Sequence, residues 1–192
     1  MQSAQVRSKY PKNTQQGFTL LELLLTMAII AVLARLALPA LDFAQRNEAN
    51  RVFTHMTALL ANARATSIAT HLVTVICPSS DGLNCENNWS AGAISFIDRD
   101  NNRQKTEGDQ LIDVVSWTSG TNGASHALRG TISWRAFGNR QSIRIDALGQ
   151  LADQNGTFTW CPAPQTAFTP QQMLINSAGR VRFASDNQLA CL

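Results

Sequence analysis

The sequence lacks the short motifs that mark the common catalytic and metal sites. It contains no H-E-x-x-H, no G-x-S-x-G, no phosphate-cradling glycine loop and no C-x-x-C pair. None of its three histidines stands beside a motif for a nucleophile or at zinc-finger spacing from a cysteine. We therefore expect no catalytic residues, no metal and no cofactor, and we do not expect an enzyme.

Glycine is also missing between Phe18 and His71, where Pro39 is the only helix breaker. The 24 residues 18–41 are almost entirely apolar, and at about 1.5 Å per residue a helix of that length crosses a bilayer. Farther on, apolar residues recur at spacings of three and four, the pattern of one helix face: Val52, Met56, Leu59, Leu60 and Ala63. We expect one helix over about 19–71, kinked or loosened at Pro39, whose second half packs on a domain.

The formal charge of +3 comes from the first residues of the chain. Arg7, Lys9 and Lys12 precede Gly17, and the rest of the chain has 13 basic and 13 acidic residues. A basic flank before an apolar run keeps that flank in the cytoplasm and sends the remainder outward. The apolar run is longer than the core of an ordinary secretory signal, so we expect it to anchor the chain.

After Gly17, the acidic and the basic residues are concentrated in different parts of the chain. Residues 77–113 contain three basic and seven acidic residues, whereas residues 129–192 contain six arginines and three aspartates. Any contact with nucleic acid must therefore depend on local clustering of the arginines in the later part.

The four cysteines are Cys77, Cys85, Cys161 and Cys191. In an exported domain an even number of cysteines indicates two disulfides, and three pairings are possible. We favour Cys77–Cys85, which closes a short loop, together with Cys161–Cys191, which holds the C-terminal tail.

After His71 the helical period gives way to short β-branched and aromatic runs separated by Gly, Asn, Asp and Pro. Short strands at this spacing favour antiparallel sheets packed against the amphipathic half of the helix. The strands are expected at residues 72–76, 93–97, 111–117, 131–137, 142–145, 156–160, 173–176 and 181–183.

The stretch Gly17-Phe18-Thr19-Leu20-Leu21-Glu22 resembles the prepilin peptidase site of type IV pilins and type II secretion pseudopilins. The resemblance implies cleavage after Gly17, N-methylation of Phe18 and a role for Glu22 in assembly. A carboxylate in a bilayer requires a partner, and cleavage creates one in the new amino group of Phe18.

The order of landmarks in the later part resembles the GspH/FimT group of minor pilins. These landmarks are Cys77, Cys85, Trp89 before Gly92, Phe96, Asp98 and Gly179-Arg180. The resemblance implies an α+β, type IV pilin-like fold, with a long N-terminal helix on antiparallel sheets. We expect a removed leader (1–17), a transmembrane half-helix (18–41), an amphipathic half-helix (42–71) and a periplasmic β-rich domain (72–192).

Gly179-Arg180-Val181-Arg182 resembles the GRxR element of FimT-type minor pilins, which implies DNA binding. Alternate residues of a strand face the same side, so Arg180 and Arg182 are expected to project together and grip phosphate oxygens. Such contacts carry no sequence preference. Further DNA-binding candidates are Arg135, Arg140 and Arg144.

Two other features favour structural roles. Asp98, Asp100 and Asp109 are spaced loosely like the ligands of a calcium loop, but Arg103 stands where the turn glycine belongs, which favours a polar hairpin turn. The four tryptophans are spread along the chain, which favours core positions over base-stacking platforms.

The resemblance leaves two functions open. The first is a minor pilin that binds extracellular DNA for natural transformation. The second is a structural subunit without DNA binding, either a minor pseudopilin of type II secretion or a pilus-priming minor pilin. The implied partners are the prepilin peptidase, other major and minor pilin subunits, the inner membrane and, for the first function, DNA. The implied location is the inner membrane, by a single pass, before assembly and the extracellular pilus afterwards.

Overall fold

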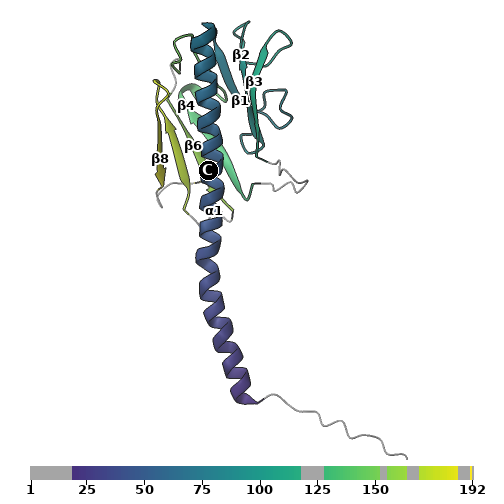
Figure 1. The fold of residues 1–192 in the computed structure, drawn as a ribbon, viewed down its shortest axis with the longest axis vertical. Coiled ribbons are helices and arrows are strands. Elements are labelled where there is room, and N and C mark those ends of the chain that lie inside the picture. Colours follow the sequence, from purple (N-terminus) through teal and green to yellow (C-terminus); the bar gives the residue numbers. More distant parts are fainter. Residues whose placement is uncertain (1–18, 118–127, 152–154, 164–168, 186–190, 192) are drawn as a thin grey trace, which may run out of the picture. The chain divides into compact units, whose positions relative to one another are not determined.

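The computed structural model describes residues 19–117, 128–151, 155–163, 169–185 and 191, with the backbone alone at 36–45, 139 and 185. One long helix, α1 (Leu20–Thr70), precedes all the strands (Figure 1). This confirms the helix expected over 19–71. A kink or a loosened turn is expected at Pro39, but α1 continues through this residue. One proline removes only a single hydrogen bond of the helix, so the helix can continue on both sides of it.

The chain divides into two compact units, residues 1–40 and 41–192. Within the described part of the chain, no helix contains a segment that is both long enough and apolar enough to span a bilayer. The membrane span expected at residues 18–41 is therefore not confirmed.

The described residues after α1 form two antiparallel four-stranded sheets. The first sheet has the order β3-β2-β1-β5, and the second has the order β4-β6-β7-β8. The strands are β1 (Thr74–Pro78), β2 (Gly92–Ile97), β3 (Gln110–Ser116), β4 (Gly130–Ala136), β5 (Ile143–Ile145), β6 (Gly156–Pro162), β7 (Gln171–Ile175) and β8 (Val181–Ser185). Each of the expected strands is present, with small shifts at its ends.

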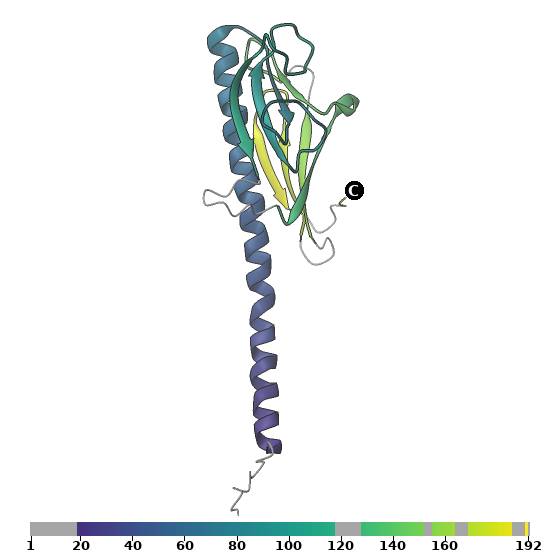
Figure 2. The ribbon, with the colours of Figure 1, turned by 90° about the vertical axis from the view of Figure 1, so that its right-hand side faces the viewer.

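The C-terminal part of α1 lies against one side of the two sheets (Figures 1 and 2). All five residues predicted for this helix face, Val52, Met56, Leu59, Leu60 and Ala63, are buried, and Ala49 and Phe53 join them. This apolar helix face contributes to one core with side chains from both sheets. Burial of that face holds the second half of α1 on the sheets.

The tryptophans belong to the core, as expected. Trp89, Trp117, Trp134 and Trp160 are each at most 6% exposed. The ring centroid of Phe158 lies 4.7 Å from that of Trp89 and 4.4 Å from that of Trp134. These rings join the loop before β2 to the second sheet.

Both disulfides are those favoured from the sequence. Cys77 and Cys85 close a loop after β1, with their Cα atoms 5.5 Å apart. Cys161, in β6, is joined to Cys191 with a Cα separation of 5.8 Å. The second bond closes a ring of chain that contains both β7 and β8.

Candidate nucleic-acid interface

The N-terminal end of α1 is capped locally. The hydroxyl of Thr19 accepts a hydrogen bond from the backbone N–H of Glu22 at 3.2 Å. Thr19 and Glu22 stand at the two ends of a capping-box pattern, and an acidic group in the first turn stabilises a helix. Gly17 and Phe18 lie outside the described residues, so the cleavage junction and its pairing with Glu22 stay predictions.

The first turns of α1 expose apolar side chains all round the helix. Leu20 is 76% exposed, Met27 65% and Ile30 64%. A contiguous apolar surface of this kind marks contact with a membrane or with another protein. This segment is therefore expected to be covered in the functional state of the protein.

On the second sheet, two arginines belong to one row of directly opposed residues. Arg135 in β4 pairs with Thr157, Thr157 pairs with Leu174, and Leu174 pairs with Arg182 in β8. Directly opposed residues share a face of a sheet. The neighbouring row, Trp134, Phe158 and Met173, is buried in the core, so the row with the arginines faces solvent.

Arg180 lies in the β7–β8 turn, one residue before the strand, and not within the strand as the alternation argument assumes. Its backbone N–H donates to the side-chain oxygen of Asn176 at 2.8 Å. Gly179 before it has φ +72°, a left-handed conformation that favours glycine. The turn therefore places Arg180 beside the row that ends at Arg182.

This turn is also attached to α1. The guanidinium of Arg64 donates to the carbonyl oxygen of Gly179 at 3.3 Å and to that of Gly149 at 2.8 Å. A Cβ atom added to Gly179 would lie 2.8 Å from Cζ of Arg64. Glycine is thus required at position 179 both for its backbone angle and for the approach of Arg64.

The arginines of the row and of the turn surround one hollow of about 520 Å³. None of its lining residues is acidic, and all three arginines are exposed. We call Arg135, Arg180 and Arg182 the arginine face. Arg135 thus joins the predicted pair, although 45 residues separate Arg135 from Arg180 in the chain.

The same hollow is bordered by an aromatic ring that the sequence interpretation assigned to a strand end. β4 stops at Ala136, and Phe137 starts a short 3-10 turn in which Gly138 has φ +74°. Phe137 is consequently 85% exposed. The Phe137-Gly138-Asn139 sequence is the signal that could have placed this ring in a turn.

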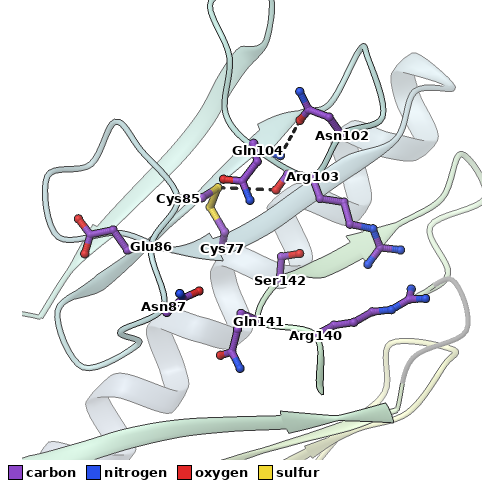
Figure 3. Close-up of a pocket in the computed structure, with 10 residues that line it drawn as sticks. All are labelled: Cys77, Cys85, Glu86, Asn87, Asn102, Arg103, Gln104, Arg140, Gln141 and Ser142. Carbon is purple, nitrogen blue, oxygen red and sulfur yellow. Dashed lines mark hydrogen bonds between the residues drawn. A yellow bond between two sulfur atoms is a disulfide. The ribbon is translucent and has the colours of Figure 1, made fainter. Parts of the chain in front are cut away.

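The structure places Arg140 elsewhere, in a second hollow of about 420 Å³ that we call the disulfide pocket (Figure 3). Its lining residues are Cys77, Cys85, Glu86, Asn87, Asn102, Arg103, Gln104, Arg140, Gln141 and Ser142. Arg144, in β5, acts electrostatically on Arg103 in the pocket wall. Arg140 and Arg144 are therefore grouped with Arg103, a residue that sequence reasoning treated only as a missing turn glycine.

The acidic loop between β2 and β3 is organised by its own backbone. Carboxylate oxygens of Asp98 accept N–H bonds from Asn102 and Arg103, each at 3.1 Å. Burial raises the pKa of Asp98 despite these bonds.

Burial also acts to raise the pKa of Asp109, but hydrogen bonds from Arg99 and Thr106 outweigh it, and that pKa is lowered. Oxygens of Asp98, Asp100 and Asp109 also lie within 4.8 Å of one another, so a polar turn without a metal stays a prediction.

The sequence matches two protein families and two fimbrial proteins. Residues 12–34 match the prokaryotic N-terminal methylation motif, and residues 54–179 match the family described as type II transport protein GspH. The fimbrial protein EcpC of Eikenella corrodens is 27% identical over 151 residues, which cover 78% of this chain and 82% of that protein. A fimbrial protein of Moraxella nonliquefaciens is 45% identical over 60 residues, 31% of this chain and 36% of that protein.

Among solved structures, the type IV minor pilin FimU of Pseudomonas aeruginosa is similar, with a TM-score of 0.47 and 18% identity. The similarity covers 74% of this chain and 92% of that chain.

The long helix, the two antiparallel sheets and the methylation motif together define a minor pilin-like filament subunit. The family match spans most of the chain, and the protein belongs to the GspH family, in the GspH/FimT-like group of minor pilins. Membership and the motif imply processing by the prepilin peptidase and assembly with other pilins.

Proposed function

We propose that the protein is a minor type IV pilin that binds extracellular DNA without sequence preference, for uptake in natural transformation. The observation that supports this most directly is the arginine face, where three guanidiniums from β4, the β7–β8 turn and β8 border one hollow with no acidic lining residue. Guanidiniums grip phosphate oxygens bidentately, and such contacts position a nucleic acid without reading its bases.

The dimensions of the arginine face suit a nucleic-acid strand. Arg135 and Arg182 are three strand spacings apart, about 14 Å between Cα atoms. Phosphates of one DNA strand succeed each other by about 3.4 Å along the duplex axis. The face can therefore follow a backbone over several phosphates, and the exposed ring of Phe137 offers a stacking platform for an unpaired base.

In this proposal the N-terminal segment delivers the domain to the filament. The prepilin peptidase cuts between Gly17 and Phe18, and the new amino group of Phe18 is methylated. Residues 18–41 hold the protein in the inner membrane, with the domain in the periplasm, until assembly. Glu22 then pairs with the amino group of Phe18, in the same chain or in a neighbouring subunit.

The test is DNA binding by the full-length protein in detergent, measured by fluorescence anisotropy at several salt concentrations. Arg180→Ala with Arg182→Ala is expected to weaken binding about tenfold or more and to lower the slope of log K against log salt by about two. The matched control is Arg99→Ala with Arg129→Ala, which removes the same charge from exposed arginines elsewhere and should retain most of the affinity.

A structural subunit without DNA binding is the second candidate, either a minor pseudopilin of type II secretion or a pilus-priming minor pilin. The match to the family described as type II transport protein GspH favours it. One result would support this second function and exclude the first. DNA binding would then be weak, would not change with salt, and would be equal in wild type and the arginine-face variant.

A further inference from the structure

The disulfide pocket is built from three separate segments, independently of the arginine face. They are the loop closed by Cys77 and Cys85, residues 102–104 of the β2–β3 connection, and residues 140–142 before β5. Figure 3 shows the side chains of Arg103 and Arg140 extending toward the same side of the hollow. The rest of the wall consists of amide and hydroxyl groups, the disulfide and one carboxylate, that of Glu86.

The positive charges of this region act on one another. Burial lowers the pKa of Arg103, and the charges of Arg140 and then Arg144 lower it further. Like charges that share a partly buried site repel one another more strongly than they would in water. The charge of Asp98 acts in the opposite direction but does not cancel these effects, so an anion bound beside Arg103 and Arg140 would relieve their repulsion.

Among the described residues, one hydrogen-bond donor in the wall of the disulfide pocket has no acceptor. The Nη1 group of Arg103 is buried and has no hydrogen-bond partner among the described residues. A buried donor without an acceptor destabilises a fold, and the cost is larger when the donor is charged. An acceptor supplied by a ligand would remove that cost.

The backbone of Arg103 is held by its surroundings. Its backbone has φ 65°, a left-handed conformation unusual for a residue with a side chain, and its N–H donates to Asp98. The Sγ atom of Cys85 lies 3.9 Å from its carbonyl oxygen, and because a disulfide sulfur carries no proton this is a contact and not a hydrogen bond. Asp98 and the disulfide thus fix the point in the pocket wall from which the side chain of Arg103 starts.

The nearby carboxylates are already engaged. The oxygens of Asp98 accept backbone N–H bonds, and an oxygen of Glu86 accepts the hydroxyl of Ser80 at 2.5 Å. These acids hold the surrounding loops in place. An external anion with several acceptor oxygens is the complement that the remaining donors lack.

We propose that the disulfide pocket binds a phosphate group, with Arg103 and Arg140 as its direct ligands and Arg144 as a supporting charge. A phosphate dianion, with several acceptor oxygens, matches the two guanidiniums and the amide and hydroxyl donors of the wall better than a single carboxylate does. The group can come from inorganic phosphate or from a phosphate monoester such as the end of a DNA strand.

Titration calorimetry of the full-length protein in detergent, with inorganic phosphate against chloride at equal ionic strength, tests this proposal. Wild type is expected to bind one phosphate saturably. Arg103→Gln with Arg140→Gln should weaken binding at least about tenfold, whereas Arg135→Gln with Arg182→Gln should leave it unchanged. Arg140→Lys keeps the charge and the exposed position but loses the planar fork, so an intermediate loss is expected.

A second arm uses an oligonucleotide with and without a terminal phosphate. If binding of the phosphorylated oligonucleotide, and not of the unphosphorylated one, depends on Arg103 and Arg140, the phosphate group comes from a strand end. If only inorganic phosphate binds at the pocket, the ligand is the free ion. The proposal is overturned if neither inorganic phosphate nor the phosphorylated oligonucleotide binds saturably. It is also overturned if the Arg135 and Arg182 variant loses as much phosphate binding as the Arg103 and Arg140 variant. Binding of an acidic peptide but of neither phosphate form also overturns it and makes the pocket a protein contact.

Discussion

The arginine face and the disulfide pocket present the same side chain in two different settings. On the arginine face the guanidiniums are exposed on a regular sheet and its turn, with solvent to screen them. In the disulfide pocket Arg103 is partly buried in irregular loops, and this burial, together with the charges of Arg140 and Arg144, lowers its pKa. The first setting suits a long, weakly held polyanion, and the second suits a single small anion held from several sides.

The two settings also depend on different covalent bonds. Cys161–Cys191 closes the ring that contains β7 and β8, and hence Arg180 and Arg182. Cys77–Cys85 closes the loop that forms one wall of the pocket. Each site can therefore be disturbed while the other is kept as an internal control.

The largest expected effect follows removal of the longer cross-link. Cys161→Ser with Cys191→Ser should lower the free energy of unfolding by about 3–4 kcal/mol, the chain-entropy value for a separation of 30 residues. Urea titration measures this loss. DNA affinity should fall, while phosphate binding at the pocket persists under conditions where the variant is folded.

The matched variant, Cys77→Ser with Cys85→Ser, opens a loop with a separation of 8 residues, and about 2–3 kcal/mol is expected. It should show the opposite pattern, with phosphate binding lost and DNA affinity kept. If both variants lose both activities in proportion to stability, the two sites are not separate.

Phe137 tests whether the arginine face prefers unpaired bases. Phe137→Ala should weaken binding of single-stranded DNA by about 1–3 kcal/mol, the contribution of one stacked base, and change duplex binding little. Because the ring is 85% exposed, the melting temperature should stay near that of wild type. Leu148→Ala, at a side chain that is 75% exposed, is the control, and an equal loss there would mean nonspecific adhesion.

Gly179→Ala tests the attachment of the β7–β8 turn to α1. A side chain at φ +72° that also meets Arg64 should destabilise the fold by about 1–3 kcal/mol and displace Arg180. Thermal unfolding and DNA binding should both change, and phosphate binding should not. Gly108→Ala, where an added Cβ meets nothing within 4 Å, should be silent in all three measurements.

The smallest effect is expected at Asp81, within the loop closed by Cys77 and Cys85. Hydrogen bonds from the N–H groups of Asn84 and Leu83 hold the pKa of Asp81 well below its ordinary value of 3.8. A depressed pKa in the folded state contributes stability above 3.8 that is lost as the pH falls through the folded value. Wild type should therefore be slightly more stable than Asp81→Asn at neutral pH, and the difference should shrink in acid. A difference that stays constant with pH would contradict this.

Local patterns were sufficient for α1 and the eight strands of the described residues, whereas the disulfide pairing was one of three possibilities and was chosen for its short loop. Apolar periodicity depends on neighbouring residues, so it can be read without knowledge of the fold. The grouping of Arg135 with Arg182 could not be read this way, because β5 joins the first sheet while β4 pairs with β6. Phe137 and Arg103 were missed because each depends on a left-handed turn residue, Gly138 in one case and Arg103 itself in the other.

The ring closed by Cys161 and Cys191 has a mechanical consequence for a protein at the surface of a filament. β8 is the edge strand of its sheet, and a pull on a polymer held by Arg182 would peel that strand away one hydrogen bond at a time. The covalent bond limits how far the peeled segment can extend, and it transfers the load to β6, which is flanked on both sides. Arg64 gives the tension a second route, from the β7–β8 turn directly into α1. Under a load applied at Arg182, these two attachments are expected to keep β8 close to its sheet.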